Sequence, residues 1–319
     1  AEACFALAVA RGDDPGAFIE YGRFLRRVGR PVQAGEMFER AIKYAAQTDD
    51  PATLASAYSN MGLLLQVRGD LANAEQMHRK ALEITRMRGD QQGVAGAYSN
   101  IGSILKARGD LPKAEVMLRK ALAIEEKNGR MRGIANQYCN LGLISRRLGD
   151  LTRAEDMLRR ALAIDEKLGR FESMANQYGN IGLVLKARGN LDDAEVMLRK
   201  ALAINENLGR LEGMASDYGN LGLIFQARGQ LAEAERMHLT SLAMEEQVGR
   251  LEGMARTHHS LGQIAHSRHE QQRAREHWTR ARDLFAQIGM PMDVRIMDGL
   301  LAELGEERHG HAGSDAGRA

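Results

Sequence analysis

Five asparagines recur at a spacing of 40 residues, and their side chains are well suited to bind another molecule. They are Asn60, Asn100, Asn140, Asn180 and Asn220. A side-chain amide donates and accepts hydrogen bonds at once, so a row of amides could pair with successive peptide units of an extended chain whatever its side chains are. The same amides could instead bond an adjacent helix and only fix the geometry of the repeat. The sequence leaves both interpretations open.

A second row of polar residues lies six positions after the asparagines and is basic in the middle of the chain. It contains Lys106, Arg146 and Lys186, with Arg147 beside Arg146, and neutral glutamines occupy the positions on either side. Such a positive centre favours an acidic peptide or a carboxylate terminus. Charged residues on a helix also often form a solvated face without a ligand, so this alternative stands beside the first.

The elements that carry these rows repeat with the same period. Each asparagine follows a tyrosine by two residues and precedes a glycine by two, as in Tyr138, Asn140 and Gly142. A fixed period of about 20–50 residues is typical of a solenoid, in which each unit buries its apolar face only against its neighbours. Solenoids rarely perform chemistry and instead offer a long surface to another molecule.

Within one period the apolar spacing predicts two helices. In the third copy Ile134, Ile144 and Leu148 belong to a series at three- and four-residue spacing, which is typical of one buried helix face. Gly149 then supplies a left-handed stop and Asp150 supplies the cap of the next helix. A second apolar series follows and ends at the next glycine. Each period is therefore expected to form a pair of antiparallel helices.

The pattern resembles the tetratricopeptide repeat, which has an aromatic residue, glycine four residues later, Gly-Asp at the turn and then Ala-Glu, an apolar residue and Ala. In the third copy these are Tyr138, Gly142, Gly149, Asp150, Ala154, Glu155, Leu158 and Ala161. The 40-residue form, which also carries Tyr-x-Asn-x-Gly, is similar to the repeats of kinesin light chains and of the LGN/Pins scaffolds. The resemblance implies an all-α, right-handed superhelical solenoid of antiparallel helix pairs with a C-terminal capping helix.

The repeats predict a single solenoid over residues 1–304. The expected segments are the second helix of a truncated repeat at 1–12, helix pairs at 17–50, 53–90, 93–130, 133–170, 173–210, 213–250 and 253–289, and the capping helix at 292–304. Residues 305–319 are rich in Gly, Ser and His and are expected to be disordered. Because the chain begins inside a repeat, we expect further repeats before Ala1, and an exposed N-terminal edge through which a monomer could weakly self-associate.

In this family the first helix of each pair lines a concave groove. The resemblance therefore places the asparagine row and the basic row in the groove, together with Asn136 and Asn176, four residues before the asparagine row. A further row, three residues after the asparagines, is mainly apolar and contains Leu143, Leu183 and Leu223. The carboxylate clamp of the family carries a second asparagine at that position, so a strict clamp is not expected here. An amphipathic partner with acidic and apolar side chains fits better.

Several other classes of function are not expected. A net charge of +2 and an aromatic fraction of 5% argue against nucleic-acid binding in the groove. The sequence has no apolar run long enough to cross a membrane. It also lacks phosphate-cradling, nucleophile-elbow and dinucleotide motifs, so we expect no catalytic residues, no enzyme activity and no cofactor. His266 and His269 are three residues apart on a helix but have no evident third ligand, so no metal site is expected.

The two cysteines, Cys4 and Cys139, lie more than three repeats apart, too far for a disulfide in a solenoid. Reduced thiols favour the cytoplasm. The leading prediction is a non-catalytic scaffold that binds an extended or amphipathic, acidic peptide segment in its concave groove. The alternative is the sensor or regulatory arm of a larger signalling protein, whose effector would lie N-terminal to Ala1.

Overall fold

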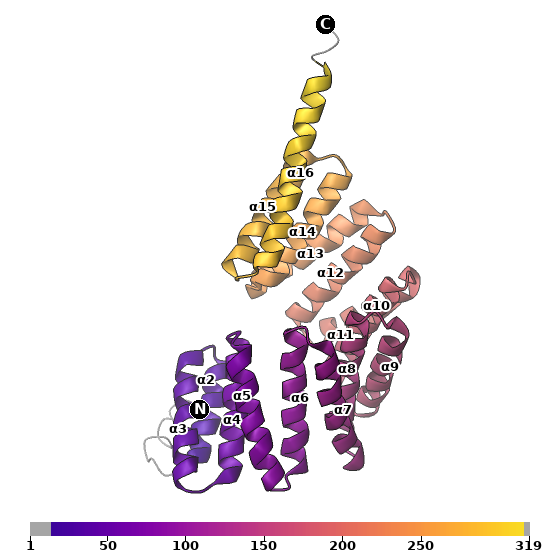
Figure 1. The fold of residues 1–319 in the computed structure, drawn as a ribbon. Helices are drawn as coiled ribbons and strands as arrows, with labels where there is room; N and C mark the ends of the chain where they lie inside the picture. Colours follow the sequence, from indigo (N-terminus) through magenta and orange to yellow (C-terminus); the bar gives the residue numbers. More distant parts are fainter. Residues whose placement is uncertain (1–13, 316–319) are drawn as a thin grey trace. The chain divides into compact units, whose positions relative to one another are not determined.

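The computed structural model describes residues 14–315, with side chains through residue 304, and every element in this part of the chain is a helix (Figure 1). The helices are α2 (Pro15–Arg27), α3 (Pro31–Gln47), α4 (Pro51–Val67), α5 (Leu71–Met87), α6 (Gln91–Ala107), α7 (Leu111–Lys127), α8 (Met131–Arg147), α9 (Leu151–Lys167), α10 (Phe171–Ala187), α11 (Leu191–Asn207), α12 (Leu211–Ala227), α13 (Leu231–Val248), α14 (Leu251–Ser267), α15 (Gln271–Gln287) and α16 (Pro291–Asp315). None of these described helices combines the length and the apolar character needed to cross a membrane.

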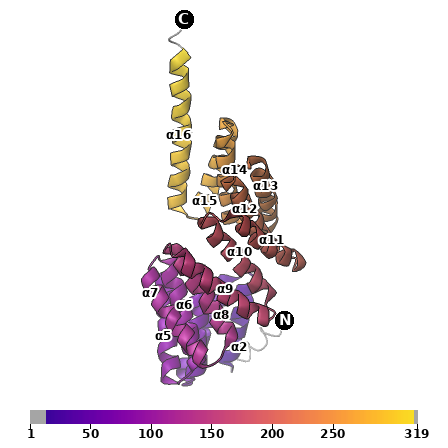
Figure 2. The same ribbon diagram turned by 90° about the vertical axis from the view of Figure 1, so that its right-hand side faces the viewer.

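The chain forms two compact units, Ala1–Ile164 and Asp165–Ala319. In the first unit α2 packs on α3, α4 on α5 and α6 on α7, and in the second α10 packs on α11, α12 on α13 and α14 on α15 (Figures 1 and 2). The first helices also contact one another within each unit: α2 with α4, α4 with α6, α6 with α8, α10 with α12, and α12 with α14. Each unit therefore presents a face made of first helices, which carries the asparagine row.

The predicted signals at the helix ends are confirmed in the third copy. Gly149 has a φ of 84°, in the left-handed region that favours glycine, and Asp150 Oδ1 accepts a hydrogen bond from the backbone N–H of Arg153 at 3.0 Å. Ile144 is buried as expected. The prediction for Leu148 is wrong, because its side chain is 50% exposed. Leu148 caps the C-terminus of α8, and at that position the chain has already left the packed helix face.

Glycine in the middle of each first helix allows the second helix to approach closely. A Cβ added at Gly142 in α8 would lie 2.8 Å from Leu158 Cγ and 3.2 Å from the carbonyl oxygen of Ala154, both in α9. Such a side chain would force the two helices apart. Gly96, also within a first helix, has no atom within 4 Å of its added Cβ. Substitutions at these two glycines therefore distinguish the effect of helix packing from the effect of helix propensity.

Ion pairs join successive repeats within each unit. Arg108 at the end of α6 donates to Glu75 of α5 at 2.9 Å, and Arg228 at the end of α12 donates to Glu195 of α11 at 2.5 Å. The pattern of a single repeat does not show these pairs, because each arginine meets a glutamate of the preceding copy. The hydrogen bonds and charge of the arginines hold the pKa of Glu195 below its usual range, although burial opposes this.

The last helix differs from the prediction at its C-terminal end. Helix α16 continues to Asp315, so the end of the capping helix predicted at residue 304, and the disordered tail predicted from residue 305, are placed too early. The residues from Leu300 to Arg308 are mostly Leu, Ala, Glu and Arg, which have high helix propensity, and the single glycine among them does not stop the helix. The helix predicted at 1–12 and the last four residues of the predicted tail lie outside the described residues.

We expect Gly142→Ala to lower the free energy of unfolding by about 1–2 kcal/mol. Overpacking costs about 1–3 kcal/mol, and the better helix propensity of alanine returns up to about 1 kcal/mol. The matched variant Gly96→Ala adds the same methyl group to open space and should gain about 0.5–1 kcal/mol. Urea denaturation followed by circular dichroism measures both. Equal shifts for the two variants would show that the α8–α9 approach does not depend on glycine.

Candidate functional site

The first two asparagines of the row make hydrogen bonds within the protein. Asn60 is 5% exposed; its Nδ2 donates to the Ser56 carbonyl at 2.8 Å, and its Oδ1 accepts from Arg23 Nε at 3.1 Å. Asn100 Nδ2 lies 3.4 Å from His78 Nδ1. At these two positions the amides connect neighbouring residues and helices of the first unit.

The third asparagine belongs to a group of cations on α6 and α8. Lys106 Nζ donates to Asn140 Oδ1 at 3.1 Å, and Arg147 donates to the Lys106 carbonyl at 2.9 Å. Arg146 is half-buried and pairs with no carboxylate among the described residues. We call Lys106, Arg146 and Arg147 the basic cluster. It brings together three residues that the sequence predicted to act together.

Two cations of the basic cluster have pKa values below their usual range. Burial lowers the pKa of Lys106, the charge of Arg147 lowers it further, and Cys139 acts in the opposite direction. Burial, followed by the charge of Arg147, also lowers the pKa of Arg146. Burial is the main cause of both shifts, and an anion bound here would favour the charged forms of both side chains and so be stabilised.

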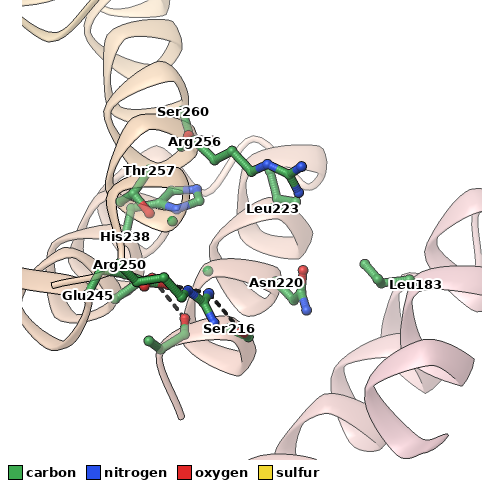
Figure 3. Close-up of a pocket in the computed structure, with 14 residues that line it drawn as sticks. Leu183, Ser216, Asn220, Leu223, His238, Glu245, Arg250, Arg256, Thr257 and Ser260 are labelled. Carbon is green, nitrogen blue, oxygen red and sulfur yellow. Dashed lines mark hydrogen bonds and ion pairs between the residues drawn. The ribbon is translucent and has the colours of Figure 1, made fainter. Parts of the chain in front are cut away.

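In the second unit the first helices α10, α12 and α14 and the second helix α13 line a cavity of about 310 Å³ (Figure 3). Its lining includes three predicted residues: Leu183 of α10, and Asn220 and Leu223 of α12. The lining residues that the sequence analysis did not select are Ala215, Ser216, Gly219, His238, Ser241, Glu245, Arg250, Gly253, Arg256, Thr257 and Ser260. We call this cavity the α12–α14 pocket.

One side of the α12–α14 pocket is charged but paired. Arg250 donates to Glu245 Oε1 at 2.6 Å and to Ser216 Oγ at 3.1 Å, as the dashed lines in Figure 3 show. The Glu245 side chain is 2% exposed, and burial raises its pKa, although Arg250 opposes this. Its second oxygen, Oε2, has no hydrogen-bond partner among the described residues. An acceptor is therefore buried at the pocket without a donor.

His238 of α13 supplies a second buried polar group. It is 2% exposed, and burial lowers its pKa to about 4, so the imidazole is neutral at pH 7. Neither ring nitrogen has a hydrogen-bond partner in the described part of the chain. The ring fits because residue 222 is glycine, where an added Cβ would lie 2.7 Å from His238 Nε2.

A comparison between the repeat copies would have revealed these residues. The positions equivalent to His238 and Ser241 in the preceding copy are Leu198 and Ala201, both fully buried. Polar residues that replace buried apolar ones in some copies and not in others mark a local change of chemistry. A search for residues that recur in every copy misses the positions at which the copies differ.

The remaining predicted residues lie on first helices without forming a defined site. Asn180, Lys186 and Leu143 are half-buried, whereas Asn136 and Asn176 are exposed. Asn180 and Asn220 make no hydrogen bond through their side chains with other described residues. Their amides are therefore available to a ligand, unlike those of Asn60 and Asn100.

Buried polar residues join a second helix to the next first helix in two of the described copies, Asp165 to Gln177 and Asn205 to Asp217. In the second unit Asn205 Nδ2 of α11 donates to Asp217 Oδ2 of α12 at 2.7 Å. Asp217 is 5% exposed, and burial raises its pKa to about 7, although the hydrogen bond from Asn205 and the charge of Arg210 oppose this. Asp217 therefore changes its ionisation near neutral pH.

The model of the tetratricopeptide repeat family matches residues 16–87, 53–127, 133–207 and 213–287. No curated protein shows significant similarity to the sequence.

Solved structures give further similarities. The apo form of RapI is 16% identical with a TM-score of 0.71, and the match covers 86% of this chain and 98% of that one. A kinesin light chain from Podosopora anserina with nearly identical repeats is 21% identical with a TM-score of 0.51, covering 63% and 98%. A signal transduction ATPase with a tetratricopeptide repeat sensor from Pyrococcus horikoshii is 14% identical with a TM-score of 0.70, covering 92% and 46%. At these identities the similarities show the fold alone.

We expect Asp217 to make folding stability fall as the pH rises from about 4 to about 7. Its folded pKa lies above its unfolded value, so within this window the folded state binds more protons than the unfolded state and loses stability as they are released. Asp217→Asn removes this group. The stability of the variant relative to wild type should therefore increase by about 1–3 kcal/mol between pH 5 and pH 8.

Urea denaturation of both proteins at several pH values tests this expectation, and the other titrating groups cancel in the comparison. A difference between the two proteins that stays constant with pH would mean that Asp217 ionises normally in the folded protein.

Proposed function

Because the chain belongs to the tetratricopeptide repeat family, whose repeats imply a protein–protein interaction scaffold, we propose that it binds an extended or amphipathic, acidic segment of a partner protein on its face of first helices. The family resemblance found in the sequence and the all-α solenoid fold are both confirmed. The repeat fold is generally non-catalytic. We propose that this chain, too, is a non-catalytic, monomeric, cytoplasmic adaptor.

The observation that carries the proposal is the basic cluster. Two of its cations, Lys106 and Arg146, are partly desolvated and lie near the charge of Arg147. This arrangement costs folding free energy, because like charges repel and half-buried cations lose hydration. A carboxylate that binds between them removes the repulsion and restores hydrogen bonds. An acidic side chain therefore gains more here than at an isolated surface lysine.

Asn140 adds recognition of the peptide backbone. Its Oδ1 accepts from Lys106, so the geometry of that bond orients the amide, while Nδ2 makes no hydrogen bond with other described residues. Nδ2 can donate to a peptide carbonyl. Leu143 lies three residues later on the same helix and is half-buried, which offers an apolar contact next to the charged one. The three kinds of contact together favour an amphipathic, acidic segment.

We expect Arg146→Glu to weaken peptide binding at least about tenfold, since losing a charge-assisted hydrogen bond costs about 1.5–3 kcal/mol and 1.4 kcal/mol corresponds to tenfold. Peptides selected from a random phage-displayed library on the wild-type protein provide the ligands, and fluorescence anisotropy gives the dissociation constants. The selected peptides should be enriched in Asp and Glu. Their affinity should fall as salt is added, because exposed charges are screened.

Lys127→Glu provides the matched control, since it makes the same change of net charge at an exposed residue in the last turn of α7, a second helix. It should leave the dissociation constant unchanged. The proposal is wrong if the library yields no binding peptide, if the peptides lack acidic residues, or if Arg146→Glu and Lys127→Glu weaken binding equally.

A further inference from the structure

His238 of the α12–α14 pocket can be compared with a histidine at the same position of another repeat copy, which has a hydrogen-bond partner that His238 lacks. His78 occupies the same repeat position on α5 and is fully buried, and Asn100 Nδ2 lies 3.4 Å from its Nδ1. The residue equivalent to Asn100 on α14 is Ser260. Ser260 is shorter and its hydroxyl donates to the Arg256 carbonyl at 3.3 Å. His238 Nδ1 thus lacks the amide partner that its counterpart has.

A second position near His238 also has a hydroxyl residue where another copy has a side-chain amide. In an earlier copy Gln177 of α10 donates through Nε2 to Asp165 Oδ2 at 3.4 Å. The equivalent pair between α13 and α14 is Glu245 and Thr257. No hydrogen bond joins these two described residues, and Glu245 Oε2 has no partner. Here too a side-chain amide has been replaced by a short hydroxyl residue.

Both unpaired groups belong to residues that line one cavity. His238, Glu245, Thr257 and Ser260 all line the α12–α14 pocket, and Figure 3 shows them on the side formed by α13 and α14. Buried acceptors without donors are costly and rare. In each counterpart the group that satisfies the acceptor is an amide N–H, so the pocket is complementary to an amide.

We propose that the α12–α14 pocket binds the carboxamide side chain of an asparagine or glutamine in the partner segment. The carboxamide NH₂ donates to His238 Nδ1, to Glu245 Oε2, or to both. Its carbonyl oxygen accepts from the Asn220 amide, and Leu223 contacts its methylene groups. This inference rests on the proposed function in one respect, namely that the ligand is a protein segment.

Other side chains fit the pocket less well. A carboxylate would face the buried carboxylate of Glu245, which already has Arg250 as its counter-ion. An aliphatic side chain would leave both acceptors without donors. A carboxamide is neutral and supplies two N–H donors together with one acceptor. A cavity of about 310 Å³ accommodates one such side chain.

The first test uses N-acetylglutamine N-methylamide as the probe, with N-acetylmethionine N-methylamide as a matched control of similar length that has no side-chain amide. Long-range ¹H–¹⁵N NMR of the histidine-labelled protein follows the imidazole nitrogens, and His238→Leu, which reproduces Leu198, assigns the His238 signals. We expect the glutamine probe to shift His238 Nδ1 in a saturable manner and the methionine probe to leave it unchanged. No response up to the solubility limit of the probe, or equal responses to both probes, would overturn the proposal.

The second test introduces amide side chains into the pocket by substitution. Ser260→Asn and Thr257→Gln restore amide side chains that the chain itself carries at Asn100 and Gln177, so both variants should fold, with a higher melting temperature than wild type. Each should weaken the response to the glutamine probe at least about tenfold, as expected for a competing internal hydrogen bond. An unchanged response in both variants would contradict the proposal.

The two proposals can fail separately. Arg146→Glu should leave the glutamine probe response intact, because the basic cluster and the pocket belong to different units. Peptides selected on the wild-type protein should carry Asn or Gln at one position, and those selected on Ser260→Asn should lose only this preference. Acidic peptides without an amide preference would support the scaffold and reject the amide pocket.

Discussion

The structure depends on the close approach of the two helices in each pair at a glycine in the middle of the first helix. Because the glycine has no side chain, the residue opposite it on the second helix is pressed against bare backbone. That residue is leucine at Leu158 and Leu198, histidine at His78 and His238, and tryptophan at Trp278. The same contact thus accepts an aliphatic side chain, an imidazole ring or an indole ring without a change of fold. It is the point at which one repeat copy can acquire a different chemistry from the next.

Most of the fold could be predicted because its determinants are local. Gly149 and Asp150 act within a single turn, and the three- and four-residue apolar spacing is a property of one helix. The wrong predictions concern helix ends, which the apolar spacing alone does not determine. Leu148 is exposed because it caps its helix. Helix α16 continues to Asp315 because helix propensity outweighs a nearby glycine. Contacts between copies, such as that between Arg108 and Glu75, require knowledge of the stacking.

The candidate sites were predictable only in part, for a related reason. Recurrence drew attention to Asn140 and the basic cluster, on which the proposed function rests, but it gave Asn60 and Asn100 the same weight, although the amide NH₂ groups of these two already have partners inside the protein. A period identifies equivalent positions and does not say which partner each amide meets. His238, Ser241 and Glu245 do not recur as a set, so a search for shared residues passed over them. In a repeat protein the shared residues specify the fold, and we propose that the differences between copies indicate where a ligand binds.

The differences in the α12–α14 pocket do not serve folding. Leucine and alanine at the positions of His238 and Ser241 would be buried without polar atoms, and amides at residues 257 and 260 would satisfy the acceptors that now lack donors. The chain contains each of these alternatives in other copies of its own repeat. Buried polar groups without partners lower stability by about 1–3 kcal/mol each. A solenoid distributes its stability over many helix pairs, so one pair can carry such a loss. If the pocket binds an amide as proposed, the free energy lost in folding this pair becomes available as binding free energy when the ligand supplies the missing donors.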